Sequence, residues 1–389
     1  MIFMESRDRV LAALNLEEPD RVPTHAIAID GNNVETILGR ESRDSFEALE
    51  RMVRENPDNW LEALNSVVDS FEKAIFSGMC EAGIKLGLDV IQVGILPYQF
   101  ISKDEMSDIF GRIWKLKNYH GHFDPYYTHG TIDSIEKWEE LKQKFEDIYT
   151  PQYTRKARKF FRTIKRKYGD KIFIFAETIY AGIFESAWQG MGIEYFFKQL
   201  RKNPRLIADI FDTIAEFNVA MFNAYMDVGV EVFCEAGDIA YKSGPFFSPK
   251  KYNELLLPAY KKLTHAVHDR GKKIILHTDG QITPLLDMIV NSGFDGLQSL
   301  EPTANVDLAL VKKKVGDKIC LLGNIDVGEV LTTGIKQDVF DAVKYAIKTA
   351  GPGGGFMVSP TNMHQGVNPQ NLRWMVEATH EYGKYPLNL

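Results

Sequence analysis

Residues of the types that bind metals and move protons stand at the ends of apolar stretches throughout this chain. The clearest example is "IILHTDG", in which an apolar run ends in His277, Thr278 and Asp279. On an extended backbone His277 and Asp279 point the same way, because they are two residues apart. An imidazole nitrogen and a carboxylate oxygen are ligands that zinc accepts. The tripeptide therefore predicts a metal-binding edge; the alternative is the hydrogen-bonded polar end of an ordinary strand.

Short stretches rich in β-branched or aromatic residues recur along the chain, each followed by a turn and a helix-like segment. We expect eight strands, at residues 24–29, 89–95, 172–176, 231–234, 273–276, 296–299, 319–322 and 356–359. Mostly apolar strands that alternate with helices predict a parallel sheet covered on both faces. Eight such units favour an α/β fold of the (β/α)8 TIM-barrel type, with residues 1–389 as one domain.

The segments between the strands carry helix signals of their own. Ser248 followed by Pro249 predicts the start of a helix, and Gly271 predicts its end. Pro258 lies within this helix and should kink it. The glycine run at 351–355 precedes its strand, so we interpret it as a tight turn rather than a phosphate-binding loop.

One stretch departs from the repeat, between the second and third expected strands. Residues 99–170 form an insertion whose first part alternates like a hairpin, while "IEKWEELKQKF" and "RKARKFFRTIKRKYG" resemble helices. Long insertions in compact domains are often functional, so a lid over the barrel mouth is one interpretation. The other is an excursion with its own small core.

Active sites of such barrels lie at the carboxyl ends of the strands, where this chain carries many polar residues. We expect catalytic roles for Glu235, Asp279 and Glu301, and metal ligation by His277, Asp279 and Glu235. Asp238 could contribute to the metal site or, equally well, serve as a turn or helix-cap residue. Candidates for substrate binding are Asp30, Asn32, Glu177, Asn324, Asp326 and Asn362. Cys234 precedes Glu235, so we expect its side chain on the opposite side of the strand, in packing.

Composition excludes several classes of partner. The 389 residues carry a net charge of −7 with interspersed acids, and the absence of a basic stripe argues against nucleic acid. Charges within the first ten residues argue against a secretory signal, and we see no apolar run that could span a bilayer. The three cysteines are far apart. We therefore expect a reduced, cytoplasmic protein.

Three longer segments carry a resemblance that extends over nearly the whole chain. They are "RDRVLAALNLEEPDRVP", "FCEAGDIAYKSGPFFSPKKYNELLLPAYKKL" and "LLGNIDVGEVL". Together they resemble the uroporphyrinogen decarboxylase superfamily, whose members are TIM-barrel proteins. The resemblance implies either a porphyrinogen decarboxylase or a zinc-dependent methyltransferase that works with a corrinoid protein.

The decarboxylase branch binds substrate carboxylates with an arginine pair after the first strand. The matching stretch here is "IAIDGNN", which has no arginine. A substrate with eight carboxylates needs cationic partners, because burying unpaired carboxylates is prohibitively unfavourable. The sequence therefore resembles the methyltransferase-like branch more closely.

The zinc motif of the methyltransferases is H-x-C followed much later by a second cysteine. His277 matches the histidine, Asp279 stands in place of the first cysteine, and residues 360–362 contain no second one. Carboxylate ligands in place of thiolates make a harder, more Lewis-acidic metal. We therefore expect zinc-dependent methyl transfer from a methyl ether to the cobalt of a partner corrinoid protein. Glu235 or Glu301 would complete the metal site or protonate the leaving oxygen.

Two other functions remain open at this point. One is a lyase that decarboxylates a porphyrinogen or a smaller acid, for which Lys242 and Arg112 are the candidate basic residues. The other is a barrel with a binding or accessory role and no catalysis. The chain has no D-x-H-x-x-G element of the kind that ligates cobalamin, so any corrinoid would arrive on another protein.

Overall fold

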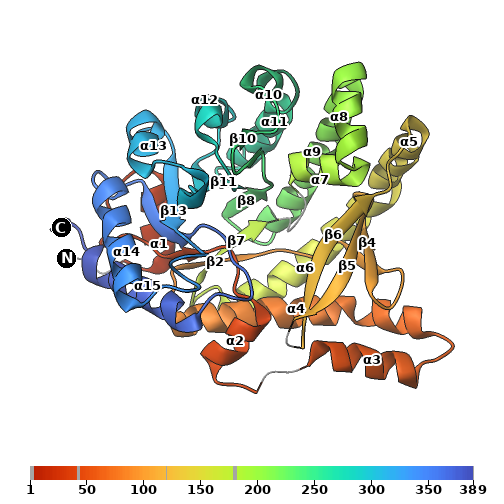
Figure 1. The fold of residues 1–389 in the computed structure, drawn as a ribbon, viewed down its shortest axis with the longest axis horizontal. Coiled ribbons are helices and arrows are strands. Elements are labelled where there is room, and N and C mark those ends of the chain that lie inside the picture. Colours follow the sequence, from red (N-terminus) through yellow and green to blue (C-terminus); the bar gives the residue numbers. More distant parts are fainter. Residues whose placement is uncertain (1–3, 42–43, 120, 178–181, 389) are drawn as a thin grey trace.

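The computed structural model describes residues 4–41, 44–119, 121–177 and 182–388. Eight strands form a parallel sheet, and a bridge between Thr24 and Val358 brings its last strand back to its first. The chain is therefore a (β/α)8 TIM barrel (Figure 1), as the alternating pattern predicted. In sheet order the strands are β1 (His25–Ala26), β2 (Val90–Val93), β7 (Phe173–Glu177), β8 (Val232–Ala236), β11 (Lys273–Thr278), β12 (Gly296–Ser299), β13 (Cys320–Ile325) and β14 (Phe356–Pro360).

Helices surround the barrel and bury its outer face. They are α2 (Gly31–Leu38), α4 (Trp60–Leu86), α6 (Thr150–Tyr168), α7 (Ile183–Met191), α8 (Ile193–Lys202), α9 (Pro204–Met226), α10 (Pro249–Leu255), α11 (Leu257–His268), α12 (Leu286–Asn291), α13 (Leu308–Val315), α14 (Lys336–Ala350) and α15 (Pro369–Tyr382). A further helix, α3 (Ser45–Glu55), packs on α4 and the inserted segment instead. Ser248 caps α10 as predicted, and the break between α10 and α11 falls just before Pro258. In the part of the chain described, no helix combines the length and apolar character needed to cross a membrane.

The barrel interior has an apolar lower layer and a polar upper layer. In the lower layer Val10, Ala13 and Leu14 of α1 (Ser6–Leu14) close the amino end. They pack against the inward side chains Val90, Phe173, Phe175, Val232, Cys234, Ile275, Cys320, Leu322 and Met357. Cys234 therefore lies in packing on the opposite side from Glu235, as expected. The next inward residue is polar on most strands, for example Gln92, His277 and Ser359, although it is Ala236 on β8. The interior therefore changes character towards the carboxyl end.

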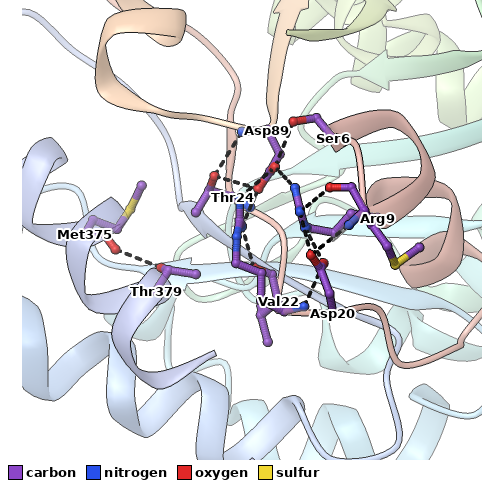
Figure 2. Close-up of polar contacts among 10 residues, drawn as sticks. Ser6, Arg9, Asp20, Val22, Thr24, Asp89, Met375 and Thr379 are labelled. Atoms are coloured by element: carbon purple, nitrogen blue, oxygen red, sulfur yellow. Dashed lines mark hydrogen bonds and ion pairs between the residues drawn. The ribbon is translucent and has the colours of Figure 1, made fainter. Parts of the chain in front are cut away.

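A buried ion-pair network holds α1 to the amino end of the barrel (Figure 2). Arg9 lies between two carboxylates, with Nε 2.6 Å from Asp20 Oδ1 and Nη1 2.6 Å from Asp89 Oδ1. Asp89 Oδ2 lies 2.7 Å from Arg21 Nη1 and accepts a hydrogen bond of 2.9 Å from the Thr24 backbone N–H. The network joins α1 to the segments that lead into β1 and β2.

The glycine run before β14 is a turn, as predicted. Gly353, Gly354 and Gly355 all have positive φ. A Cβ on Gly354 would lie 2.4 Å from the backbone carbonyl of Glu17, so the turn packs closely against the segment that follows α1.

The inserted segment begins with a small antiparallel sheet. Its strands are β3 (Tyr98–Phe100), β4 (Glu105–Asp108), β5 (Arg112–Tyr119) and β6 (His122–Gly130), followed by α5 (Ile135–Lys144) and a π-helical turn at Phe145–Tyr149. The inserted sheet has its own apolar core, which includes Trp114 of β5 and Leu64 of α4. The predicted boundary at residue 170 is too late, because α6 belongs to the barrel's helical layer: Phe161 packs on Tyr225 of α9, with ring centroids 4.3 Å apart.

The inserted sheet contacts segments that follow two different barrel strands. Tyr127 donates a hydrogen bond of 2.8 Å to the backbone oxygen of Gln189 in α7, which follows β7. The Ser45 N–H at the start of α3 donates to Gly121 O at 2.7 Å. Figure 1 shows the sheet standing to one side of the barrel, near α3 and α7. These contacts fix the inserted sheet in place beside the carboxyl end of the barrel.

Candidate metal site at the barrel mouth

Three residues at the carboxyl end of the barrel place ligand atoms close together. One ligand atom each from Asp238, His277 and Asp279 lies within 4.8 Å of the other two. His277 is in β11 and Asp279 follows it, while Asp238 follows β8, the strand that pairs directly with β11. The structure thus brings together the two residues of the H-x-D motif and adds Asp238, for which the sequence had left both a ligand and a turn or cap role open.

The His277 ring is held from behind by Gln298 of β12. His277 Nδ1 is hydrogen-bonded to Gln298 Oε1. The Gln298 amide nitrogen donates to the backbone oxygens of Pro360 at 2.9 Å and Thr361 at 3.2 Å, which directs Oε1 towards the histidine. Nε2 is then the ring nitrogen left for a ligand, the arrangement common for metal-binding histidines.

The two carboxylates are also held by neighbouring polar groups. Ser299 Oγ donates to Asp279 Oδ1 at 2.6 Å, and Asn362 Nδ2 donates to Asp279 Oδ2. Asp238 Oδ1 accepts a hydrogen bond of 2.7 Å from the backbone N–H of Asp279. Asn362, a predicted substrate-binding residue, therefore supports Asp279 in this structure.

Glu185 is a further acid beside this group, and the sequence gave no sign of it. Its carboxylate accepts a hydrogen bond from the backbone N–H of Asp238 and another of 2.7 Å from Gln189 Nε2. Gln189 Oε1 in turn accepts from Arg112 of the inserted sheet at 3.1 Å. Glu185 lies in the first turn of α7 rather than at a strand end, so a search of strand ends could not find it.

Negative charge exceeds positive charge in this cluster. Burial raises the pKa of Asp238, and the carboxylates of Asp279 and Glu185 raise it further. Burial also raises the pKa of Glu185, although Arg112 opposes the shift. Burial alone would lower the pKa of His277, but Asp279 and Asp238 outweigh it and raise that pKa. Three carboxylates around one imidazole form an environment that a divalent cation would stabilise.

Glu235 lies elsewhere than predicted. Its carboxylate points outward into the helical layer, accepting hydrogen bonds from the Ile183 N–H at 2.6 Å and from Asn218 Nδ2 of α9 at 3.2 Å. Burial raises the pKa of Glu235 to about 8. The expectation that Glu235 is a metal ligand does not agree with this position, because Cys234, not Glu235, faces the barrel interior.

Glu301 and Glu177 occupy different places at the mouth. Glu301 braces the loop after Asp279, accepting from Gly280 N at 3.1 Å and from Thr303 Oγ1 at 2.8 Å. Glu177 ends β7 and accepts a hydrogen bond of 2.6 Å from Gln92 Nε2 of β2. Burial raises the pKa of Glu177 to about 7, with His277 opposing the shift.

The other predicted substrate-binding residues lie after β1 and in or after β13. Asp30 and Asn32 stand at the start of α2. Asn324 is a buried residue of β13. Asp326 holds the following turn, where its Oδ1 accepts from Glu329 N at 2.6 Å. Within the described ranges, the compact ligand group contains none of these four.

Comparison with known proteins places the chain among its relatives. The model of the uroporphyrinogen decarboxylase (URO-D) family matches residues 115–382. The methylcobamide:CoM methyltransferase MtaA of Methanosarcina barkeri is 28% identical over 193 residues, 49% of this chain and 54% of that protein. A methylated-thiol–coenzyme M methyltransferase of Methanosarcina mazei is 24% identical over 190 residues, 49% of this chain and 48% of that protein. The uroporphyrinogen decarboxylase of Thioalkalivibrio sulfidiphilus is 24% identical over 189 residues, 47% of this chain and 51% of that protein.

The matched part spans about half the length of these curated relatives. Among solved structures, a methyltransferase from Methanosarcina mazei superposes with a TM-score of 0.70 at 19% sequence identity. That match covers 98% of this chain and 99% of the other. At this identity the match shows a shared fold.

Proposed function

The chain belongs to the uroporphyrinogen decarboxylase family, and from that premise we propose that it is a methyltransferase that uses zinc and a partner corrinoid protein. The observation that carries this proposal is the group of Asp238, His277 and Asp279 at the barrel mouth. Two methyltransferases among the relatives support it. The missing arginine pair in "IAIDGNN" supports it against the decarboxylase branch.

The donor set fits zinc. Zinc accepts one imidazole nitrogen and carboxylate oxygens as ligands, and catalytic zinc sites keep a position open for substrate. Gln298 and Ser299 hold His277 and Asp279 from behind, as supporting residues do in metal sites. When bound, zinc supplies Lewis acidity, and oxygen ligands make it harder than thiolates would. This donor set favours an oxygen-bearing substrate, for which we propose a methyl ether.

The residues of the chain have separate tasks in this proposal. Asp238, His277 and Asp279 hold the metal, and the inserted sheet positions α7 with Glu185 beside them. In the proposed transfer, cobalt(I) of the partner corrinoid protein would supply the electron pair for the new bond to the methyl group. The bond between the methyl group and the ether oxygen would break, and the oxygen, which keeps that electron pair, would need a proton. We assign this proton to Glu177, because it faces the barrel interior and has a pKa near neutrality. Glu177 thereby replaces Glu235, whose carboxylate faces the helical layer.

The candidate basic residues give the decarboxylase alternative no support. Arg112 is 1% exposed, and its Nε lies 2.6 Å from Asp108, so its charge is already paired. Lys242 lies in the exposed turn between β9 (Ala240–Tyr241) and β10 (Gly244–Pro245). A carboxylate-rich substrate would need cations at the mouth, where this chain instead gathers acids.

Metal content tests the proposal directly. Elemental mass spectrometry of the purified chain should find about one zinc per chain, which is lost in His277→Ala. His265→Ala is the matched control, because His265 lies on the exposed side of α11. The zinc-loaded chain should also transfer methyl groups from an aryl methyl ether to a reduced corrinoid protein, followed by the absorbance of methyl-cobalt. Absence of metal from the wild-type chain after zinc loading would overturn the proposed site.

A further inference from the structure

Six inward side chains join into one hydrogen-bonded series across the barrel interior, above the apolar layer. Their strands are β11, β12, β14, β1, β2 and β7, and every one of these side chains is at most 7% exposed. We name this series the interior chain; in order it contains His277, Gln298, Ser359, His25, Gln92 and Glu177. Its links run around the inside of the barrel: four join neighbouring strands, and the link from Gln298 to Ser359 passes over β13.

The His277 end of the interior chain has a fixed polarity. The amide nitrogen of Gln298 faces the backbone oxygens of Pro360 and Thr361, which can only accept hydrogen bonds. Rotating the amide by half a turn would bring its oxygen against these two oxygens. Gln298 Oε1 therefore stays towards His277, and His277 Nδ1 must carry the hydrogen.

The Glu177 end leads to the opposite result for His25. Gln92 Nε2 donates to the Glu177 carboxylate at 2.6 Å, so Gln92 Oε1 faces His25 Nε2 at 3.1 Å. His25 Nε2 must then carry the hydrogen. Complete burial, opposed by the Gln92 contact but aided by nearby His277, lowers the pKa of His25 to about 3, so the ring is neutral and has one N–H. His25 Nδ1 therefore accepts from the Ser359 hydroxyl, 2.9 Å away.

All five links then donate in one direction, from His277 towards Glu177. We propose that the interior chain imposes opposite tautomers on its two histidines, Nδ1–H at His277 and Nε2–H at His25, and that Gln298 is the residue that positions His277 for ligation through Nε2. The role of Gln298 in this inference rests on the proposed metal site. The tautomers themselves follow from the hydrogen-bond partners of two neutral rings and hold without metal.

Nuclear magnetic resonance of the metal-free protein tests the tautomers. In protein labelled with ¹⁵N-histidine, long-range proton–nitrogen correlations at about pH 9 distinguish Nδ1–H from Nε2–H in neutral rings. Signals are assigned by their loss in His25→Asn and His277→Ala. Opposite tautomers as stated are expected; the same tautomer at both rings, or the reverse pair, would overturn the inference.

One variant separates the links of the interior chain. In Gln92→Met, His25 loses its acceptor and should change to Nδ1–H, with the Ser359 hydroxyl turning to the Pro360 oxygen at 2.9 Å. His277 should keep its Nδ1–H form, because Gln298 remains anchored. A His25 tautomer that does not change in Gln92→Met would contradict the proposed order of donors.

Zinc affinity tests the role of Gln298. Competition with a chromophoric chelator should show that Gln298→Met binds zinc about 10–100-fold more weakly than the wild type. This is the usual effect of removing a group that supports a metal-bound histidine. Gln337→Met, on the exposed face of α14, should bind as the wild type does. Equal affinity in Gln298→Met would overturn the positioning role. If the wild-type chain binds no zinc but shows the stated tautomers, the proposed function fails and the interior chain stands.

Discussion

The two ends of the barrel each bury a group of charges, and the two groups differ in balance. At the amino end, Arg9 and Arg21 face Asp20 and Asp89, so positive and negative charges are equal in number. At the carboxyl end, three carboxylates surround His277, and the Arg112 guanidinium beyond Gln189 is paired with Asp108. The first group is complete within the chain, whereas the second lacks positive charge.

Carboxyl pKa values follow this difference. Burial would raise the pKa of Asp89, but Arg21 and Arg9 outweigh it and hold the pKa below its usual value. Asp238 is buried too, and its charged neighbours Asp279 and Glu185 raise its pKa further. A buried acid needs either a cationic partner or a proton, and only the amino end supplies the partner internally. Unbalanced buried charge thus distinguishes the candidate site from a structural network of similar composition.

The largest expected effect comes from breaking the balanced group. Arg9→Met should lower the free energy of unfolding by about 3–5 kcal/mol, because Asp20 loses its buried partner and Asp89 keeps only Arg21. Arg7→Met is the matched control on the same helix: Arg7 is 51% exposed in its ion pair with Glu231, and its loss should change stability by about 1 kcal/mol or less. Urea denaturation measures both. Similar losses in the two variants would show that the network contributes no more than a surface pair.

A second prediction concerns Glu235, a buried acid outside both groups. Its pKa is raised from 4.5 to about 8, so the unfolded chain releases this proton above about pH 4.5 while the folded chain keeps it up to about pH 8. Wild-type stability should therefore fall across this window more steeply than that of Glu235→Gln, which does not titrate, by about 1.4 kcal/mol for each pH unit. Unfolding measured at several pH values checks the slope, and identical slopes would refute it. Zinc content should be unchanged, since Glu235 faces the helical layer.

The smallest expected effect lies in the unbalanced group and has the opposite sign. Asp238→Asn removes one of the crowded carboxylates but keeps an oxygen that can accept from the Asp279 N–H. The metal-free protein should therefore gain about 1 kcal/mol of stability near pH 8, while zinc retention falls. Asp89→Asn is the control at the other end and should lose stability. Destabilisation by both substitutions would mean that the two ends do not differ as proposed.

Sequence pattern alone predicted all eight barrel strands, because an apolar strand followed by a helix is a local signal. The two-residue spacing of His277 and Asp279 likewise placed them on one face. The inserted segment was recognised, but its end was set too late, since α6 resembles the amphipathic helices of the insertion and only its packing on α9 assigns it to the barrel.

The choice between Glu235 and Asp238 depended on tertiary structure. Alternation along β8 separates Cys234 from Glu235, but both faces of a strand in this barrel are buried, so residue type does not show which face is the interior. Glu185 joins the site because α7 brings it against Asp238, and the interior chain forms only when six distant strands meet. The local pattern of the sequence determined the elements and the H-x-D pair; the closure of the barrel decided which acids face that pair and which way its histidine is held.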